Sequence, residues 1–273
     1  MTITALMDDY CPKARFCGEH GLSYLLESGG RRALFDAGQS GAFLRNAAVL
    51  GVGLGRLDAV ALSHGHYDHA GGLGALYELM APDSPPLSAG PGYDRERFSL
   101  GPAGKSSIGL PAASRPPRAP AARLVDRPTE LLPGLFALPA AAYGPGEAPA
   151  PRFRALDPAG NELADDFSDE LSLALPGREG VTVITGCAHR GIAAIARQAL
   201  DFFPGARLDA VIGGFPLADL PDGELARSAE ALAELNPRRL YCGHCTGPRG
   251  YAALALALPC PVTWLHCGLR VEL

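Results

Sequence analysis

Short apolar runs separated by glycine-rich turns mark the first third of the chain. Residues 21–27 and 32–36 predict two strands of a hairpin, because a Gly-Gly pair lies between them. Residues 41–50 carry a helical pattern. The apolar run at 57–62 is short and ends in a turn-rich segment, which is typical of a buried strand. This part of the chain therefore predicts mixed α/β structure.

The same alternation of strands and helices returns after residue 170. Strands are predicted at 171–175, 181–185, 208–212, 239–241, 262–265 and 269–272, and helices at 191–203, 222–235 and 250–258. Two β-rich halves with helices outside them suggest an internal pseudo-symmetry, although no residue-level repeat is visible.

Proline dominates the stretch between these halves. Residues 82–160 hold 16 of the chain's 25 prolines in 79 positions, so regular structure cannot fill it. We predict one domain over 1–273 with an ordered insertion or lid at about 82–160. Disorder is the alternative, but residues 131–138 still offer a turn and a strand that can pack.

Composition narrows the classes of partner. Hydrophobic residues make up 47% and charged residues 19% of the chain, which is typical of a soluble globular protein. A net charge of −5 without a lysine or arginine tract argues against nucleic acid as a partner. The N-terminus does not resemble a secretory signal, and the apolar stretch at 251–265 is too short and too proline-interrupted to cross a membrane. We expect a cytoplasmic protein without a membrane partner, and its oligomeric state stays open.

The strongest chemical signal follows the apolar run at 57–62. His64, His66, Asp68 and His69 fall within six positions, and they include three of the chain's seven histidines. Imidazole and carboxylate are ligands for zinc, manganese or iron. His64 and His66 can face one ion while the other two face a second, about 3.5–4 Å away. A polar surface loop rich in histidine is the alternative, and chance clustering explains this pattern poorly.

Two more predicted strands end in residues of the same chemical type. Cys187 and His189 follow the strand at 181–185, and His244 follows the strand at 239–241. Five of the seven histidines thus occupy three strand-end loops, where a sheet can present side chains to a cleft. A buried structural histidine is the alternative for His189 or His244 alone. His20 could line the same cleft, whereas His266 fits a packed or exposed position better.

Seven cysteines are an odd number, which favours free thiols over a disulfide framework. Cys242 and Cys245 form a C-x-x-C pair around His244. A redox or structural zinc role is less favoured, because no second pair lies at a suitable spacing.

The His64-x-His66-x-Asp68-His69 motif after a strand, with Leu34-Phe35-Asp36-Ala37-Gly38 upstream, resembles the metallo-β-lactamase superfamily. Within it the chain is most similar to the branch of dihydropterin-methyl-(ribofuranosyl)aminobenzene-phosphate synthases. The segments that carry this finer resemblance are Glu19–Ser23, Val183–His189, Ile212–Phe215 and His244–Gly247.

The resemblance implies an α/β fold, an αβ/βα four-layer sandwich with metals at one edge between two sheets. It implies one or two divalent ions, with zinc favoured over manganese or iron, and Asp36 as a residue that orients a ligand. The implied metal ligands are His64, His66, Asp68, His69, His189 and His244, and Asp68 and His189 are the candidate catalytic residues.

The chain departs from the family pattern at two places. Where the superfamily supplies a histidine and a bridging aspartate, this sequence carries Asp166 and Cys187, so His189 would replace one missing ligand. Where the branch usually has a histidine after Gly-Gly-Phe, this sequence has Pro216, which can neither bind a metal nor donate a hydrogen bond.

The leading hypothesis is a metal-dependent enzyme acting on a phosphorylated or pterin-like small molecule. It would be a synthase in which an arylamine displaces pyrophosphate, or a hydrolase that uses metal-activated water. The main alternative is a non-catalytic protein that binds a pterin or phosphate ligand; di-iron redox chemistry is less favoured. Candidates for aromatic walls are Tyr67, Tyr93, Phe98, Phe136, Tyr143 and Phe153, and a core position is the favoured alternative for each. Candidates for a phosphate contact are Arg95, Arg97 and Lys105, and a surface role is the favoured alternative for these.

Overall fold

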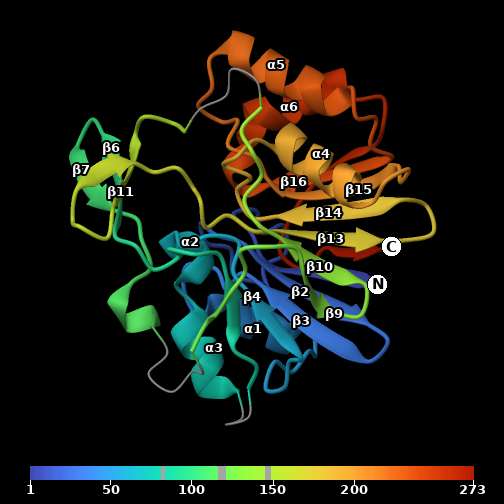
Figure 1. The fold of residues 1–273 in the computed structure, drawn as a ribbon. Coiled ribbons are helices and arrows are strands. Elements are labelled where there is room, and N and C mark those ends of the chain that lie inside the picture. Colours follow the sequence, from blue (N-terminus) through green and yellow to red (C-terminus); the bar gives the residue numbers. More distant parts are fainter. Residues whose placement is uncertain (81–83, 116–120, 145–148) are drawn as a thin grey trace.

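Two seven-stranded sheets pack face to face, and helices cover the outer side of each (Figure 1). The computed structural model describes residues 1–80, 84–115, 121–144 and 149–273. The order of layers is helix, sheet, sheet, helix, as the resemblance to the metallo-β-lactamase fold implied.

The first sheet has the strand order β18-β1-β2-β3-β4-β5-β8. Its strands are β1 (Thr2–Met7), β2 (Ser23–Ser28), β3 (Arg31–Phe35), β4 (Ala59–Ala61), β5 (Leu87–Ala89), β8 (Arg123–Leu124) and β18 (Arg270–Glu272). The helices of this half are α1 (Ala42–Val49), α2 (Tyr67–Ala70) and α3 (Leu73–Leu79). The predicted strand at 57–62 is β4, which is shorter than predicted, and the metal motif begins at His64, three residues after its end.

The second sheet has the strand order β17-β16-β15-β14-β13-β10-β9. Its strands are β9 (Thr129–Leu132), β10 (Leu135–Leu138), β13 (Ser172–Pro176), β14 (Val181–Thr185), β15 (Leu208–Gly214), β16 (Arg239–Gly243) and β17 (Val262–Trp264). Helices α4 (Ile192–Phe202), α5 (Asp222–Ala233) and α6 (Gly247–Ala257) cover its outer face. The strands and helices predicted after residue 170 are all present, with ends that differ by a few residues.

A third, four-stranded sheet projects from one side of the sandwich (Figure 1). It consists of β6 (Arg97–Gly101), β7 (Gly104–Ser107), β11 (Phe153–Leu156) and β12 (Glu162–Ala164); two short 3-10 helices are η1 (Ala112–Ser114) and η2 (His244–Thr246). The predicted insertion at 82–160 thus contributes strands to all three sheets, because β5 and β8 extend the first and β9 and β10 the second.

The hairpin between β2 and β3 follows directly from its two glycines. Gly29 and Gly30 have φ angles of 56° and 77°, and Ser28 pairs with Arg31 across the turn. A two-residue turn with positive φ at both positions matches the right-handed twist of the paired strands, and glycine adopts it without steric cost.

Apolar side chains form three buried clusters that hold the layers together. One lies between the two large sheets and includes Tyr24, Phe35, Leu173 and Ile184. The others pack the first sheet against α1 and α3 and the second sheet against α4, α5 and α6. Every residue of β14 and β15 is buried, as expected for parallel strands covered on both faces.

The strand directions bring the predicted ligand loops to one edge of the sandwich. Strands β14, β15, β16 and β17 are mutually parallel, and β3, β4, β5 and β8 are as well. Carboxyl ends of parallel strands lie at one edge of a sheet, where open α/β sheets place their ligand sites. No helix in the described parts of the chain has both the length and the apolar character needed to cross a membrane.

Candidate metal centre

The six predicted metal ligands come together at this edge, and Cys187 lies among them. His64 and His66 follow β4, while Asp68 and His69 lie on the four-residue helix α2. His189 follows β14, and His244 starts η2 directly after β16. The ligand-type atoms of these seven residues form two groups, each with its atoms within 4.8 Å of one another: His64, His66 and His189, and Asp68, His69, Cys187 and His244. Asp9 and His20 form a further group of this kind with His244.

Three glycines in the motif loop allow the close approach of other backbone segments. A Cβ atom at Gly65 would lie 1.7 Å from the carbonyl oxygen of Tyr93, and one at Gly71 would lie 2.0 Å from that of Gln39. Gly71 and Gly72 themselves have ordinary helical φ angles of −62° and −82°. The absence of a side chain, and not conformational freedom, is therefore what these positions require.

The backbone is strained at residues of the same site. Among the described residues, five non-glycine positions have positive φ, and four lie in or beside the two groups: Asp36 (62°), Phe167 (50°), Ala188 (46°) and His244 (50°). Such conformations cost about 1–3 kcal/mol each and persist where surrounding contacts enforce them. Strain concentrated at one edge of the sandwich is typical of a functional site.

The first group is a set of three imidazoles whose Nε2 atoms are buried and unpartnered; His64 and His66 are buried, and His189 is partly exposed. Ring centres lie 4.5 Å apart for His64 and His66, 4.8 Å for His64 and His189 and 5.0 Å for His66 and His189. Nε2 of each ring is buried and has no hydrogen-bond partner among the described residues. Burial lowers the pKa of His66 to about 3 and the pKa values of His64 and His189 well below their usual range. Three neutral, unpartnered nitrogens fit a divalent cation.

The second group combines nitrogen, sulfur and oxygen. Nε2 of His69 lies 3.1 Å from Sγ of Cys187, and Nε2 of His244 lies 3.2 Å from Oδ2 of Asp68. Burial alone would raise the pKa of Asp68, but the nearby His69 and His244 outweigh it and hold that pKa well below its usual range. Burial, reinforced by neighbouring Cys245, raises the pKa of the Cys187 thiol well above normal. This mixed donor set also fits zinc, which accepts all three ligand types.

Carboxylates outside the two groups orient the histidine rings. Oδ2 of Asp36 lies 2.7 Å from Nδ1 of His69, in agreement with the orienting role that the family resemblance implied. Oδ1 of Asp9 lies 2.6 Å from Nδ1 of His244. A carboxylate on the outer ring nitrogen fixes the tautomer that leaves Nε2 free for a metal. Asp9 escaped the sequence analysis, although it follows β1 just as the recognised ligands follow their own strands.

His189 is held by its backbone and by an aromatic ring. Glu170 accepts hydrogen bonds from the backbone N–H groups of His189 and Arg190 at 2.6 and 2.9 Å. The His189 ring stacks on Phe167 with centres 4.0 Å apart and an interplanar angle of 10°. Burial raises the pKa of Glu170 to about 7. These contacts fix the direction of the imidazole before any ion binds.

His20 lies at the edge of the second group and lines the same cavity as His244, the position that the sequence analysis considered for it. Its Nδ1 is 2.8 Å from Asp9 and its Nε2 is 3.4 Å from Asp68, so both carboxylates link it to His244. The side chain is half exposed. His266 lies elsewhere, with Nδ1 3.0 Å from the carbonyl oxygen of Cys267. In the described parts of the chain all seven cysteines are free thiols, in agreement with the odd count.

Arg97 is a structural cation and does not face the cavity. It is 1% exposed, and it pairs with Asp165 and Asp169 at 2.8 and 2.7 Å. Asp169 in turn accepts a hydrogen bond from the backbone N–H of Gly65 at 2.8 Å. The prediction that Arg97 contacts a substrate phosphate is therefore wrong. Burying an arginine requires paired carboxylates, and here that pairing supports the motif loop from behind.

Other predicted contacts also lie away from the two groups. Asp166 is exposed and 3.8 Å from Arg95. Lys105 pairs with Glu162 and lies over the ring of Phe98. Asp166 and Cys187 are the residues that stand where the family supplies a histidine and an aspartate. Asp166 lies outside both groups, whereas Cys187 belongs to the second group.

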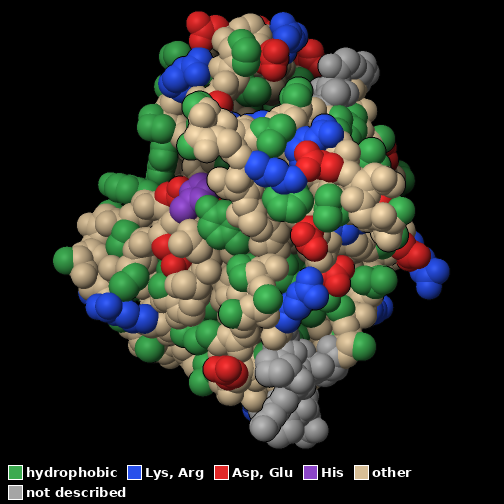
Figure 2. All heavy atoms as spheres, turned by 90° about the vertical axis from the view of Figure 1, so that its left-hand side faces the viewer, with side chains coloured by type: hydrophobic (Ala, Val, Ile, Leu, Met, Phe, Trp, Pro, Cys, Tyr) green, Lys and Arg blue, Asp and Glu red, His purple; other side chains and the backbone are tan. Residues whose placement is uncertain are grey.

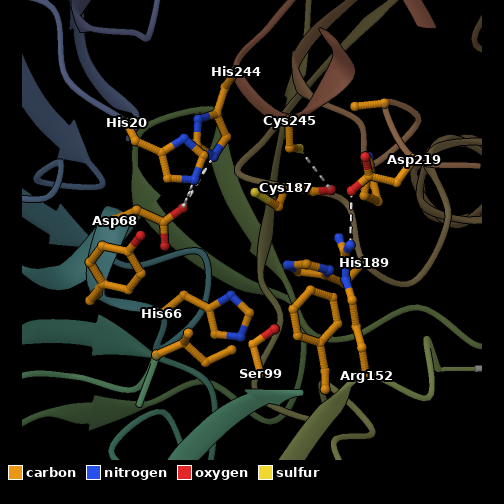
Figure 3. A pocket seen from close by; sticks show the side chains of 15 residues that line it. His20, His66, Asp68, Ser99, Arg152, Cys187, His189, Asp219, His244 and Cys245 are labelled. Atoms are coloured by element: carbon orange, nitrogen blue, oxygen red, sulfur yellow. Dashed lines mark hydrogen bonds and ion pairs between the residues drawn. The ribbon is translucent and has the colours of Figure 1, made fainter. Parts of the chain in front are cut away.

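Both groups open into a cavity of about 380 Å³ (Figure 3). Its lining residues are His20, His66, Tyr67, Asp68, Ser99, Ile108, Arg152, Phe153, Cys187, His189, Pro216, Ala218, Asp219, His244 and Cys245. Of the predicted aromatic walls, Tyr67 and Phe153 line this cavity, whereas Phe136 packs against Phe202 and Phe203. Histidine is visible in a hollow on this face in Figure 2, bordered by hydrophobic side chains.

Comparison with known proteins places the chain in a family. A sequence model of the metallo-β-lactamase superfamily matches residues 18–244. The chain is 29% identical to the 7,8-dihydropterin-6-methyl-4-(β-D-ribofuranosyl)-aminobenzene-5'-phosphate synthase of Methanocaldococcus jannaschii, over 90% of this chain and 87% of that protein.

Solved structures show the same fold over the full length. Tm1679, described as a metal-dependent hydrolase of the β-lactamase superfamily, has a TM-score of 0.87 and 32% identity, covering 100% of this chain and 99% of its own. A diphosphatase of the PhnP family shares the fold at a TM-score of 0.56 and 15% identity, covering 100% of this chain and 97% of its own. The chain belongs to the metallo-β-lactamase superfamily.

Proposed function

We propose that the chain is a metal-dependent enzyme that acts on a phosphorylated or pterin-like small molecule in the cavity of about 380 Å³. The observation that carries the proposal is the set of unpartnered Nε2 atoms of His64, His66 and His189. Buried polar atoms without partners are costly in a folded protein, so a site that retains three of them together needs a ligand. A divalent cation supplies that ligand.

Seven side chains would hold the ions. His64, His66 and His189 would hold one, and Asp68, His69, Cys187 and His244 the other. Bound divalent ions would polarise a phosphate or carbonyl oxygen and offset the charge that develops on a leaving group. Zinc is the favoured metal, because imidazole and thiolate are its preferred ligands, with manganese or iron as alternatives.

The chain's own groups would prepare the site for that chemistry. Asp36 and Asp9 fix the rings of His69 and His244, so ligand geometry is set before substrate arrives. Asp68 stays ionised and faces His244 and His20. We propose Asp68 and His189 as the catalytic residues; both line the cavity and belong to a ligand group, as His66, Cys187 and His244 also do.

Substrate recognition would rest on the cavity walls. Tyr67 and Phe153 would contact a flat ring such as a pterin, because aromatic side chains bind ring systems through their faces. Two relatives support different reactions: one is named a synthase and the other is described as a hydrolase, at similar identity to this chain. In either reaction a phosphate or pyrophosphate group would be bound or released.

The test is metal content per chain, measured by elemental mass spectrometry on protein purified without chelator. We expect about two ions in the wild type and a reduced count in His66→Ala, since one of the two groups then lacks a ligand. His266→Ala is the matched control, because that histidine lies outside both groups. Absence of metal after incubation with zinc, manganese or iron would reject the enzyme proposal.

A second function is favoured by Pro216, which lines the cavity at a position where a histidine was expected from the family. The protein would then bind a pterin or phosphate ligand without converting it. Turnover of any phosphate ester or pterin pyrophosphate that disappears in His66→Ala rules this out. Tight binding without turnover at every metal tested supports it.

A further inference from the structure

We propose that Arg152 is the anion anchor of the cavity, and that its ion pair with Asp219 is the contact which a substrate phosphate displaces. The inference rests on the proposed function, in that the cavity takes a small-molecule substrate. It assigns the anionic group of that substrate to the guanidinium of Arg152. The favoured substrate class is an aromatic phosphate monoester.

Arg152 and Asp219 come from different parts of the fold and meet at the cavity. Arg152 immediately precedes β11 in the small sheet, and Asp219 lies in the loop between β15 and α5. Nη1 of Arg152 is 2.8 Å from Oδ2 of Asp219, and both residues line the cavity (Figure 3). The ion pair thus joins the small sheet to the second large sheet beside the candidate metal centre.

Arg152 is the only lysine or arginine that lines the cavity within the described residues. Its side chain is 46% exposed, in contrast to the fully paired and buried Arg97. Its guanidinium carbon lies 4.8 Å from the centre of the Phe153 ring. Stacking of this kind orients the planar guanidinium and leaves its edges available to an anion.

The pairing with Asp219 is of a kind that a phosphate can replace. Asp219 is 73% exposed, and an exposed ion pair contributes little to stability because water solvates both partners well. A phosphate offers more charge and can accept two parallel hydrogen bonds from a guanidinium. Water would solvate the displaced carboxylate of Asp219, so breaking this ion pair would cost little free energy.

The side chains beside Arg152 indicate which chemical group the phosphate of the substrate carries. Phe153 contacts the ring of His66 with centres 5.5 Å apart and that of His189 with centres 5.4 Å apart. Tyr67 and Pro216 complete an apolar lining near the same histidines. A ligand held by Arg152 and resting on Phe153 would therefore combine a phosphate with a flat ring.

Isothermal titration calorimetry with phenyl phosphate tests this proposal on the metal-loaded protein. We expect Arg152→Ala to weaken binding about tenfold or more, since a charge-assisted pair is lost. We expect Asp219→Asn to strengthen binding several-fold, because the competing carboxylate is removed. Phenol should bind much more weakly than phenyl phosphate to the wild type and equally to wild type and Arg152→Ala.

Two variants serve as matched controls. Arg154→Ala removes an arginine two residues further along, which pairs with Glu162 and does not line the cavity. Glu179→Gln removes an exposed carboxylate paired with Arg238 at 2.7 Å. Both should bind phenyl phosphate as the wild type does. The opposite directions expected for Arg152→Ala and Asp219→Asn separate anion binding from misfolding, which could only weaken it.

Equal affinity of wild type and Arg152→Ala overturns the proposal, as does a wild type that fails to bind phenyl phosphate at millimolar concentration. Metal content of the same samples keeps the two proposals apart. Dependence on Arg152 in protein that holds no metal would uphold the anchor and reject the metal-dependent function. Full metal content, with binding of phenyl phosphate that does not depend on Arg152, would reject the anchor and leave the metal-dependent function standing.

Discussion

Asp36 and His69 form a contact that is completely buried, with Oδ2 2.7 Å from Nδ1 and neither side chain exposed. Asp36 also accepts hydrogen bonds from the backbone N–H and the hydroxyl of Ser63, both at 2.7 Å. One carboxylate therefore fixes both a ligand ring and the start of the motif loop.

Replacing Asp36 by asparagine should weaken metal binding about 10- to 100-fold, the usual effect of losing a carboxylate behind a metal-ligating histidine. The amide cannot offer both of its polar atoms as acceptors, so His69 loses its fixed tautomer. Competition with a chromogenic chelator measures the affinity. Asp58→Asn is the control, because Asp58 pairs with Arg31 near the surface, and an equal loss there would contradict the assignment.

Cys187 should give cobalt-substituted protein a thiolate-to-metal charge-transfer absorption in the near ultraviolet. Its Sγ lies among the ligand atoms of the second group, and a metal binds the thiolate despite the raised pKa of the free thiol. Cys187→Ser should abolish the band, whereas Cys245→Ser should retain it. Cys245 lines the cavity but lies outside both groups. Persistence of the band in Cys187→Ser would place the sulfur outside the coordination sphere.

His66 should make the metal-free protein less stable in acid. Burial holds its folded-state pKa at about 3, below its ordinary value, so the unfolded chain takes up the proton first as the pH falls through about 6.5. Stability is therefore lost between about pH 6.5 and about pH 3.

His66→Asn lacks this titrating group. Its free energy of unfolding relative to that of the wild type should therefore rise by about 1.4 kcal/mol for each pH unit that the pH falls within that range. Urea unfolding in the presence of chelator at pH 7, 6 and 5 measures the difference. Glu170, with its pKa raised to about 7, titrates with the opposite sign, but it is present in both proteins and cancels. A constant difference between the two proteins across these pH values would show that His66 is not buried as described.

Arg97→Ala should destabilise the fold by about 3–5 kcal/mol, because it leaves Asp165 and Asp169 buried without their partner. Chemical denaturation with the metal removed measures this effect apart from any change in metal binding. Arg95→Ala should cost less than about 1 kcal/mol, since its ion pair with Asp166 is exposed. Similar losses in the two variants would argue against a structural role specific to Arg97.

The strand and helix pattern of the second half was predictable because helices of 11 or 12 residues alternate there with short apolar strands. β14, for example, runs over Val181–Thr185, the predicted span. In the proline-rich segment the sequence predicted the turn and strand near residue 135, but the partners of β6 and β11 are set by contacts between residues far apart in the chain. No local pattern specifies which sheet a short strand joins.

The ligand histidines were predictable because each follows an apolar strand, and that local signal is visible without knowledge of the fold. Asp9 and Arg152 were not identified, since their roles depend on partners 235 and 67 positions away. Arg97 was misassigned for a similar reason. Its carboxylate partners Asp165 and Asp169 lie about 70 positions further along the chain, and only the fold brings them beside it.

Each ligand group draws side chains from both halves of the sandwich. His64, His66, Asp68 and His69 belong to the first half, and Cys187, His189 and His244 to the second. With metal bound as proposed, a growing polypeptide on the ribosome would carry incomplete coordination shells until β14 and then η2 have been synthesised and folded against the first sheet. Metal would then bind only after the two halves have docked. The ions would link side chains of two sheets that the apolar core already holds together.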